Sequence, residues 1–129
     1  MARPGPDDAG SSPVEFVLVG ALLTALTLAV LQLGFAVYVR NVVHDAAVEG
    51  AYHAALADTT ADQGADRTAE LIARTVGAGY ASDVTARETL LHGAPTVEVT
   101  VRTTLPVAGL LGIPGGLEVV AHAPAESLG

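Results

Sequence analysis

An unbroken apolar run near the N-terminus constrains this chain more than any other feature. The run extends from Phe16 to Val39 and contains no charged residue over its 24 positions. As a helix it would be about 36 Å long, enough to cross a hydrocarbon core of about 30 Å with some tilt. A cleaved secretory signal has a shorter apolar core of about 7–15 residues, followed at once by a cleavage site between small residues. We therefore expect a single membrane-spanning helix that is retained in the mature protein.

The composition excludes several classes of function. The 129-residue chain has a net charge of −8, no lysine and six scattered arginines. Nucleic-acid binding needs clustered cations to contact phosphates, so no nucleic-acid partner is expected. The chain has no cysteine, which excludes disulfides, thiolate catalysis and cysteine-ligated zinc.

Helical patterning continues past the apolar run. Residues 40–57 contain good helix formers and no proline, and Val43, Ala47, Ala51 and Ala54 form an apolar stripe at helical spacing. A second helix is predicted over residues 62–76. In this helix Glu70 and Arg74 would form an i,i+4 ion pair, and glycines follow at 77 and 79.

The remaining sequence alternates with a period of two. Residues 84–91 predict one strand, HGAP at 92–95 a turn, and 96–105 a second strand whose Val97, Val99, Val101 and Leu105 point to one side. Residues 106–116 predict an apolar loop rich in Gly and Pro, and 117–123 a third strand. The predicted class is α+β: a long transmembrane helix that extends into a juxtamembrane helix, then a second helix packed on a small antiparallel three-stranded sheet.

Glu15 directly precedes the apolar run and has two competing interpretations. Ser12-Pro13-Val14-Glu15 reads as a capping box with proline at the first helical position, which would start the helix after a disordered leader at residues 1–12. Alternatively, Glu15 is a functional charge that needs a cation nearby, because a carboxylate in apolar surroundings is costly.

The stretch Gly10-SSPV-Glu15-Phe16 favours the second interpretation. It resembles the cleavage motif of prepilin-like subunits, in which a membrane aspartyl peptidase cuts after the glycine and leaves glutamate fifth in the mature chain. The resemblance implies a cut between Gly10 and Ser11. It also implies that Glu15 pairs with the new amine of Ser11, on its own chain or on a neighbour. The Glu-Phe ending resembles the variant found in tight-adherence (Tad, Flp-type) pilus systems.

Residues 32–57, which include Glu49-Gly50-Ala51, resemble the TadE-like family. Many members of this family carry an acidic residue where Gln32 stands, and proline at 13 is also less usual. The resemblance implies a minor pilin or pseudopilin with a leader at 1–10, a transmembrane and juxtamembrane helix at 11–57 and a small exported α+β domain at 58–129. It implies a single-pass cell-membrane protein with a cytoplasmic N-terminus and an extracytoplasmic C-terminal domain. The implied partners are the prepilin peptidase, other pilin-like subunits, the inner-membrane assembly platform and membrane lipid. The alternative is a signal-anchored envelope protein, unrelated to pili, whose exported domain is a binding module.

Small residues recur within the apolar run. Ala21, Ala25 and Ala29 are spaced by four, which would let another helix approach closely, and Gln32 offers a hydrogen-bonding side chain. The competing explanations are that alanine is simply abundant and that Gln32 is merely tolerated.

No metal, cofactor or catalytic site is predicted. His44 and His53 are nine residues apart and so lie on opposite sides of a helix. Asp62, Asp66 and Glu70 form an acidic row that is typical of a solvated face, because calcium needs further oxygen ligands from a looped backbone. The chain has neither a nucleophile elbow nor a phosphate-binding glycine loop, so we expect it not to be an enzyme.

Overall fold

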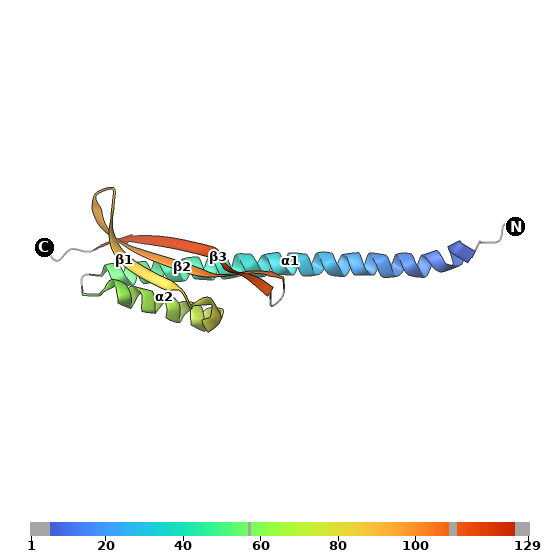
Figure 1. The fold of residues 1–129 in the computed structure, drawn as a ribbon, viewed down its shortest axis with the longest axis horizontal. Coiled ribbons are helices and arrows are strands. Elements are labelled where there is room, and N and C mark those ends of the chain that lie inside the picture. Colours follow the sequence, from blue (N-terminus) through green and yellow to red (C-terminus); the bar gives the residue numbers. More distant parts are fainter. Residues whose placement is uncertain (1–5, 57, 109–110, 126–129) are drawn as a thin grey trace.

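The computed structural model describes residues 6–56, 58–108 and 111–125. Its elements, in chain order, are α1 (Pro6–Ala55), α2 (Ala61–Thr75), a 3-10 turn η1 (Ala78–Tyr80), β1 (Val84–Leu91), β2 (Ala94–Ala108) and β3 (Leu111–Pro124). The C-terminal half of α1 lies beside α2 and beneath the sheet, while its N-terminal half projects away from the rest of the molecule (Figure 1). The predicted α+β class is confirmed.

Helix α1 changes character along its length. Between residues 12 and 31 every residue is exposed, whereas from Val39 onward one face is fully buried. The predicted stripe of Val43, Ala47, Ala51 and Ala54 belongs to this buried face. One continuous helix therefore carries both an unpartnered apolar segment and a segment that packs in the core of the C-terminal domain.

Helix α2 begins and ends close to its predicted bounds. Thr60 caps it: the Thr60 hydroxyl accepts from the Gln63 amide at 3.3 Å, and the Gln63 side chain accepts from the Thr60 amide at 2.8 Å. This reciprocal pair satisfies two backbone donors that a helix start leaves free. The predicted ion pair between Glu70 and Arg74 is present at 3.6 Å.

The sheet is an antiparallel meander in the order β1-β2-β3. Strands β1 and β2 pair from Val84 opposite Val101 to Leu91 opposite Ala94. His92 and Gly93 lie between the two strands, and both have positive φ (51° and 81°). A two-residue hairpin loop of type I′ requires positive φ at both of these positions. Strands β2 and β3 pair from Thr96 opposite Pro124 to Ala108 opposite Leu111, with two register shifts between Thr103 and Ala108.

The core lies between one face of this sheet and the helices. Strands β2 and β3 contribute their inward residues, and α2 contributes Ile72, whose side chain is 0% exposed. The valines predicted to share a face are all buried: Val97, Val99 and Val101. Residues of α1 meet those of β2 and β3 in this core, whereas α2 packs mainly against α1 and, within the sheet, against β1.

Three predictions about the fold are wrong: the loop, the helix start and the disordered leader. The predicted loop at 106–116 is largely strand, because β2 continues to Ala108 and β3 begins at Leu111. The predicted packing of the second helix on the sheet is present at β1, while α1 covers β2 and β3, which was not predicted. The helix does not start at Pro13 behind a Ser12 cap, since α1 begins at Pro6, so the described part of the leader is helical rather than disordered. Residues 1–5 of the predicted leader and residue 57, the predicted end of the juxtamembrane helix, lie outside the described residues.

Candidate functional site: the N-terminal helix and its junction with the sheet

The residues of the predicted processing site all lie on the first turns of α1. Gly10 and Ser11 are helical, Glu15 is exposed, and Phe16 is 81% exposed. Ser11 and Glu15 are four residues apart and therefore share one face of the helix. A positive charge on the backbone nitrogen of Ser11 would lie within about one helical turn of the Glu15 carboxylate.

Pro13 lies inside this part of the helix. Proline has no backbone N–H, so the carbonyl of Ala9 receives no helical hydrogen bond from position 13, and the ring also crowds the preceding turn. The residue before a proline is biased toward extended conformations, and here that residue is Ser12. Pro13 therefore weakens the helical turn that contains Gly10 and Ser11.

The residues predicted to mediate helix packing lie on the open part of α1. Ala21, Ala25 and Ala29 are exposed, so their surface is free to receive another helix. Gln32 is half-buried, and with Ala29 it lines a hollow of 450 Å³ that is closed on the other side by Leu105 and Pro106 of β2. The structure thus brings Gln32 beside the sheet, a neighbour that the sequence pattern did not predict.

The Glu49-Gly50-Ala51 element forms the junction between α1 and α2. A Cβ atom added to Gly50 would lie 1.7 Å from Oγ1 of Thr68 and 2.7 Å from the carbonyl oxygen of Gly64. Thr68 is fully buried, and its hydroxyl is 3.2 Å from the carbonyl oxygen of Ala46 and 3.0 Å from that of Gly64. Gly50 therefore permits a helix contact that any larger residue would obstruct.

The two neighbours of Gly50 also contact other elements. Ala51 is buried in the core, and the Glu49 carboxylate accepts a 2.8 Å hydrogen bond from Nη2 of Arg67 on α2. This hydrogen bond and the charge of Glu49 raise the pKa of Arg67 above its ordinary value. All three residues of the element therefore fasten the extension of the membrane helix to the C-terminal domain.

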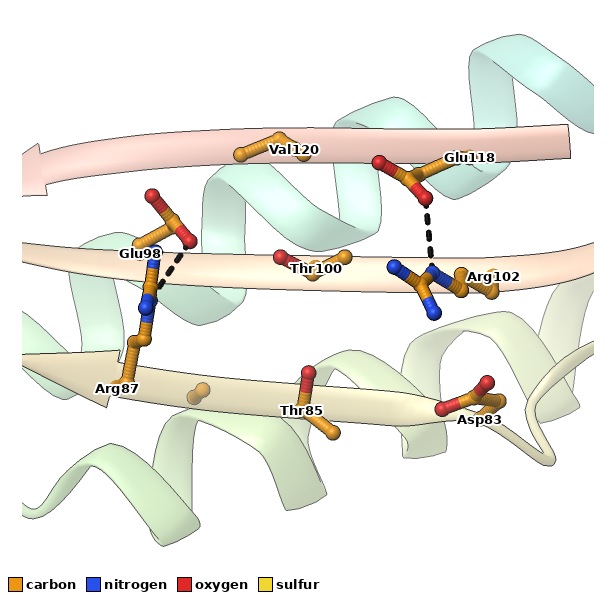
Figure 2. A pocket seen from close by; sticks show the side chains of 9 residues that line it. Asp83, Thr85, Arg87, Glu98, Thr100, Arg102, Glu118 and Val120 are labelled. Atoms are coloured by element: carbon orange, nitrogen blue, oxygen red, sulfur yellow. Dashed lines mark hydrogen bonds and ion pairs between the residues drawn. The ribbon is translucent and has the colours of Figure 1, made fainter.

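The outer face of the sheet carries ion pairs that the sequence pattern did not predict. Figure 2 shows Arg87 of β1 bonded to Glu98 of β2, with Nε to Oε1 at 2.9 Å, and Arg102 bonded to Glu118 of β3 at 2.8 Å. Nε2 of His122 also lies 2.9 Å from Oε2 of Glu98. Hydrogen bonds from Arg87 and His122 lower the pKa of Glu98 below its ordinary value of 4.5.

These ion pairs border a shallow groove of 490 Å³ that runs across all three strands. Its charged side chains largely neutralise one another, since both arginines of the groove bond to carboxylates. The third carboxylate of the groove, Asp83, has no arginine partner among the described ion pairs, so the groove carries a small negative charge. Cross-strand spacing could have indicated these pairs, because opposite residues of antiparallel strands lie about 5 Å apart.

The two predicted histidines of α1 do not converge. His44 and His53 are separated along the helix, and His44 has its closest acid in Asp45, at 3.7 Å. Over residues 6–56, 58–108 and 111–125, no group of three or more His, Asp or Glu side chains is placed to hold a metal ion.

Comparison with known proteins bears on α1 and not on the sheet. Residues 10–51 match the family model described as TadE-like protein. No curated protein and no solved structure matches the chain. The matched segment begins at the glycine of the predicted processing site and ends at Ala51 of the helix junction, so it covers both features described above. The resemblance to the TadE-like family is therefore confirmed for residues 10–51, which make up most of α1.

Proposed function

We propose that this chain is a structural subunit of a tight-adherence type pilus, a TadE-like minor pseudopilin that acts in assembly and not as an enzyme. One observation carries the proposal: the segment that matches the TadE-like family lies in α1, and the described residues leave the apolar half of this helix uncovered. Such a helix is suited to lateral packing in a membrane or filament. No cofactor is needed for this role.

The exposed apolar surface of α1 supports membrane anchoring. Among the described residues, α1 is the one helix with the length and composition to cross a bilayer. Leu22, Leu26 and Leu33 are each more than 60% exposed. Leaving such surface in water costs about 25 cal/mol per Å², so lipid or another apolar helix must cover it. In our proposal the N-terminus is cytoplasmic and the sheet domain is extracytoplasmic, because long C-terminal domains translocate largely regardless of charge.

Processing by a prepilin peptidase between Gly10 and Ser11 is the first step of the proposed function. A peptidase needs access to the scissile peptide group, and a well-formed helix shields that group. Pro13 weakens the turns on both sides of the Gly10–Ser11 bond, which supports local unwinding there.

Cleavage creates a cation close to Glu15. The new amine of Ser11 would compensate the exposed carboxylate of Glu15, within one chain or between neighbouring subunits. The neighbours would be other pilin-like subunits packed along Ala21, Ala25 and Ala29, delivered by the inner-membrane assembly platform. The N-terminal pairing would set the register between subunits, since a charge at membrane depth is tolerated when it is paired.

Mass spectrometry of the protein extracted from membranes of its own host tests the processing step. A mature N-terminus at Ser11, and an intact leader in a host that lacks the prepilin peptidase, would support the proposal. An N-terminus at Met1 or Ala2 in the normal host would overturn it. That outcome would favour a signal-anchored envelope protein whose exported domain binds another partner.

A Glu15→Ala variant separates processing from assembly. We expect the variant to be cut normally and to lose co-purification with pilin-like subunits, because the Ser11 amine no longer has its acidic partner. Glu88→Ala is the matched control, since Glu88 is exposed on β1 far from the membrane helix. Normal assembly of the Glu15→Ala variant would refute the pairing.

A further inference from the structure

The β2–β3 hairpin has one end at Pro124. At its opposite end, Leu105 and Pro106 lie beside the apolar run of α1. Leu105 and Pro106 face Leu33 and Val37 across the 450 Å³ hollow. Figure 1 shows this end of the sheet reaching along α1 toward its N-terminal half. Leu33 precedes Val39 by six residues, which is about 9 Å along the helix axis. A bilayer that the apolar run of α1 spans would therefore also contact this end of the hairpin.

The chemistry of the hairpin changes at one cross-strand pair. Arg102 and Glu118 face each other in the β2–β3 register and form an ion pair at 2.8 Å. Between them, from Thr103 to Leu117, the sequence contains no charged residue. On α1, Arg40 is the first charged residue after the apolar run, and it borders the same hollow as Leu105. The charged residues of the hairpin and those of α1 therefore end at a similar position along the axis of α1.

The backbone of this segment is hydrogen-bonded along one edge of each strand, because β2 still pairs with β3 whereas β1 pairs with β2 no further than Val101. Within a bilayer, backbone N–H and C=O groups must be hydrogen-bonded inside the protein. The ladder continues here, with Leu105 opposite Ile113 and Pro106 opposite Gly112. Pro106 and Pro114 have no N–H to leave unbonded on the strand edges. Ile113 is a large apolar side chain, and the described residues leave 53% of its surface exposed.

We propose that the distal part of the β2–β3 hairpin, represented by Leu105, Pro106, Ile113 and Pro114, inserts into the same membrane leaflet from which α1 emerges. Lipid acyl chains cover Ile113 and fill the hollow between the hairpin and α1. The chain then holds the membrane at two points, which fixes the tilt of the sheet domain against the bilayer. This inference rests on the proposed membrane span of α1.

Single-tryptophan variants of the full chain test the insertion, because the protein contains no tryptophan of its own. Ile113→Trp and Pro114→Trp report on the hairpin. Leu22→Trp reports on the apolar run, and Leu90→Trp, at the opposite end of the sheet and 69% exposed in the wild type, reports on water. All four substituted residues are exposed, and circular dichroism spectra matching that of the wild type verify that each variant is folded.

The variants are reconstituted in phosphatidylcholine vesicles with and without brominated acyl chains. We expect bromine to quench both hairpin tryptophans to an extent similar to that of Leu22→Trp, and to leave Leu90→Trp unchanged. Quenching of Leu22→Trp alone would overturn the hairpin insertion and leave the membrane span intact. A blue-shifted but unquenched hairpin tryptophan would show that protein, such as a second copy, covers the hairpin. The absence of quenching at Leu22→Trp would overturn both the span and the insertion.

Discussion

Gly50 of α1 and Gly64 of α2 face each other at a close contact between the two helices. A Cβ atom on either residue would lie 2.7 Å from the carbonyl oxygen of the other. Real Cβ atoms do not approach a backbone oxygen so closely, so both positions require glycine unless the helices separate. Because α1 also contains the apolar run, this contact holds the membrane helix in a fixed position on the C-terminal domain.

Gly50→Ala should therefore destabilise the protein. Overpacking typically costs about 1–3 kcal/mol, while alanine in a helix gains at most about 1 kcal/mol over glycine, so the net effect is a loss. Thermal unfolding of the detergent-solubilised chain, followed by circular dichroism, measures it. Gly34→Ala is the control in the same helix, because a Cβ there meets nothing within 4 Å. Equal stability of Gly50→Ala and Gly34→Ala would contradict the close approach.

Ile72 is the side chain of α2 that fills the core. It is 0% exposed, and truncation of a buried isoleucine to alanine costs about 2–5 kcal/mol through lost burial and a cavity. We expect Ile72→Ala to lower the unfolding midpoint in urea far more than Leu90→Ala, since Leu90 is 69% exposed. A Leu90→Ala loss as large as that of Ile72→Ala would mean that the core is placed incorrectly.

Thr60→Ala removes one half of the capping box at the start of α2. The free energy of unfolding should fall by about 0.5–2 kcal/mol, the usual contribution of such a cap. Thr75→Ala is a matched control within α2, because the Thr75 hydroxyl bonds only to the carbonyl of Leu71, one turn earlier in the same helix. In denaturant unfolding, only Thr60→Ala should lower the free energy of unfolding. Equal stability of the two variants would show that the cap does not contribute to it.

Periodicity predicted much of the fold because burial follows it. The strand at 84–91 has its predicted bounds, and Val97, Val99 and Val101 share the buried face because alternate residues of a strand point the same way. The stripe of α1 that includes Val43 is likewise buried. The surface against which this stripe packs was not predictable, because an apolar stripe shows that one face of a helix is buried but not which element covers it.

The two clearest failures of prediction involve Gly and Pro. Pro106 and Gly112 predicted a loop, yet they lie opposite each other in the β2–β3 ladder, where register shifts on either side accommodate a residue without an N–H. Pro13 predicted a helix start but lies inside α1. Gly50 lacked an interpretation of its own, because a glycine that permits close approach is recognisable only once its neighbour Gly64 is known.

The Glu98 cluster on the outer face of the sheet should make stability depend on acid. Arg87 and His122 lower the pKa of Glu98 in the folded protein below the ordinary value of 4.5. The folded state therefore binds the Glu98 proton less readily than the unfolded state does. The stabilisation is complete above pH 4.5 and is lost as the pH falls from there through the lower folded pKa. Glu98→Gln removes this contribution at every pH.

We expect the wild type to be more stable than Glu98→Gln above pH 4.5, with a difference that shrinks as the solution is acidified below that value. Thermal unfolding midpoints of both proteins across this range measure the difference. Glu118→Gln is the control on the same face, since the Glu118 side chain is 50% exposed and bonds to Arg102 alone among the described ion pairs. Its midpoint should follow that of the wild type through the acid range. A constant gap between wild type and Glu98→Gln at all pH values would show that Glu98 stabilises the sheet by packing and not through its charge.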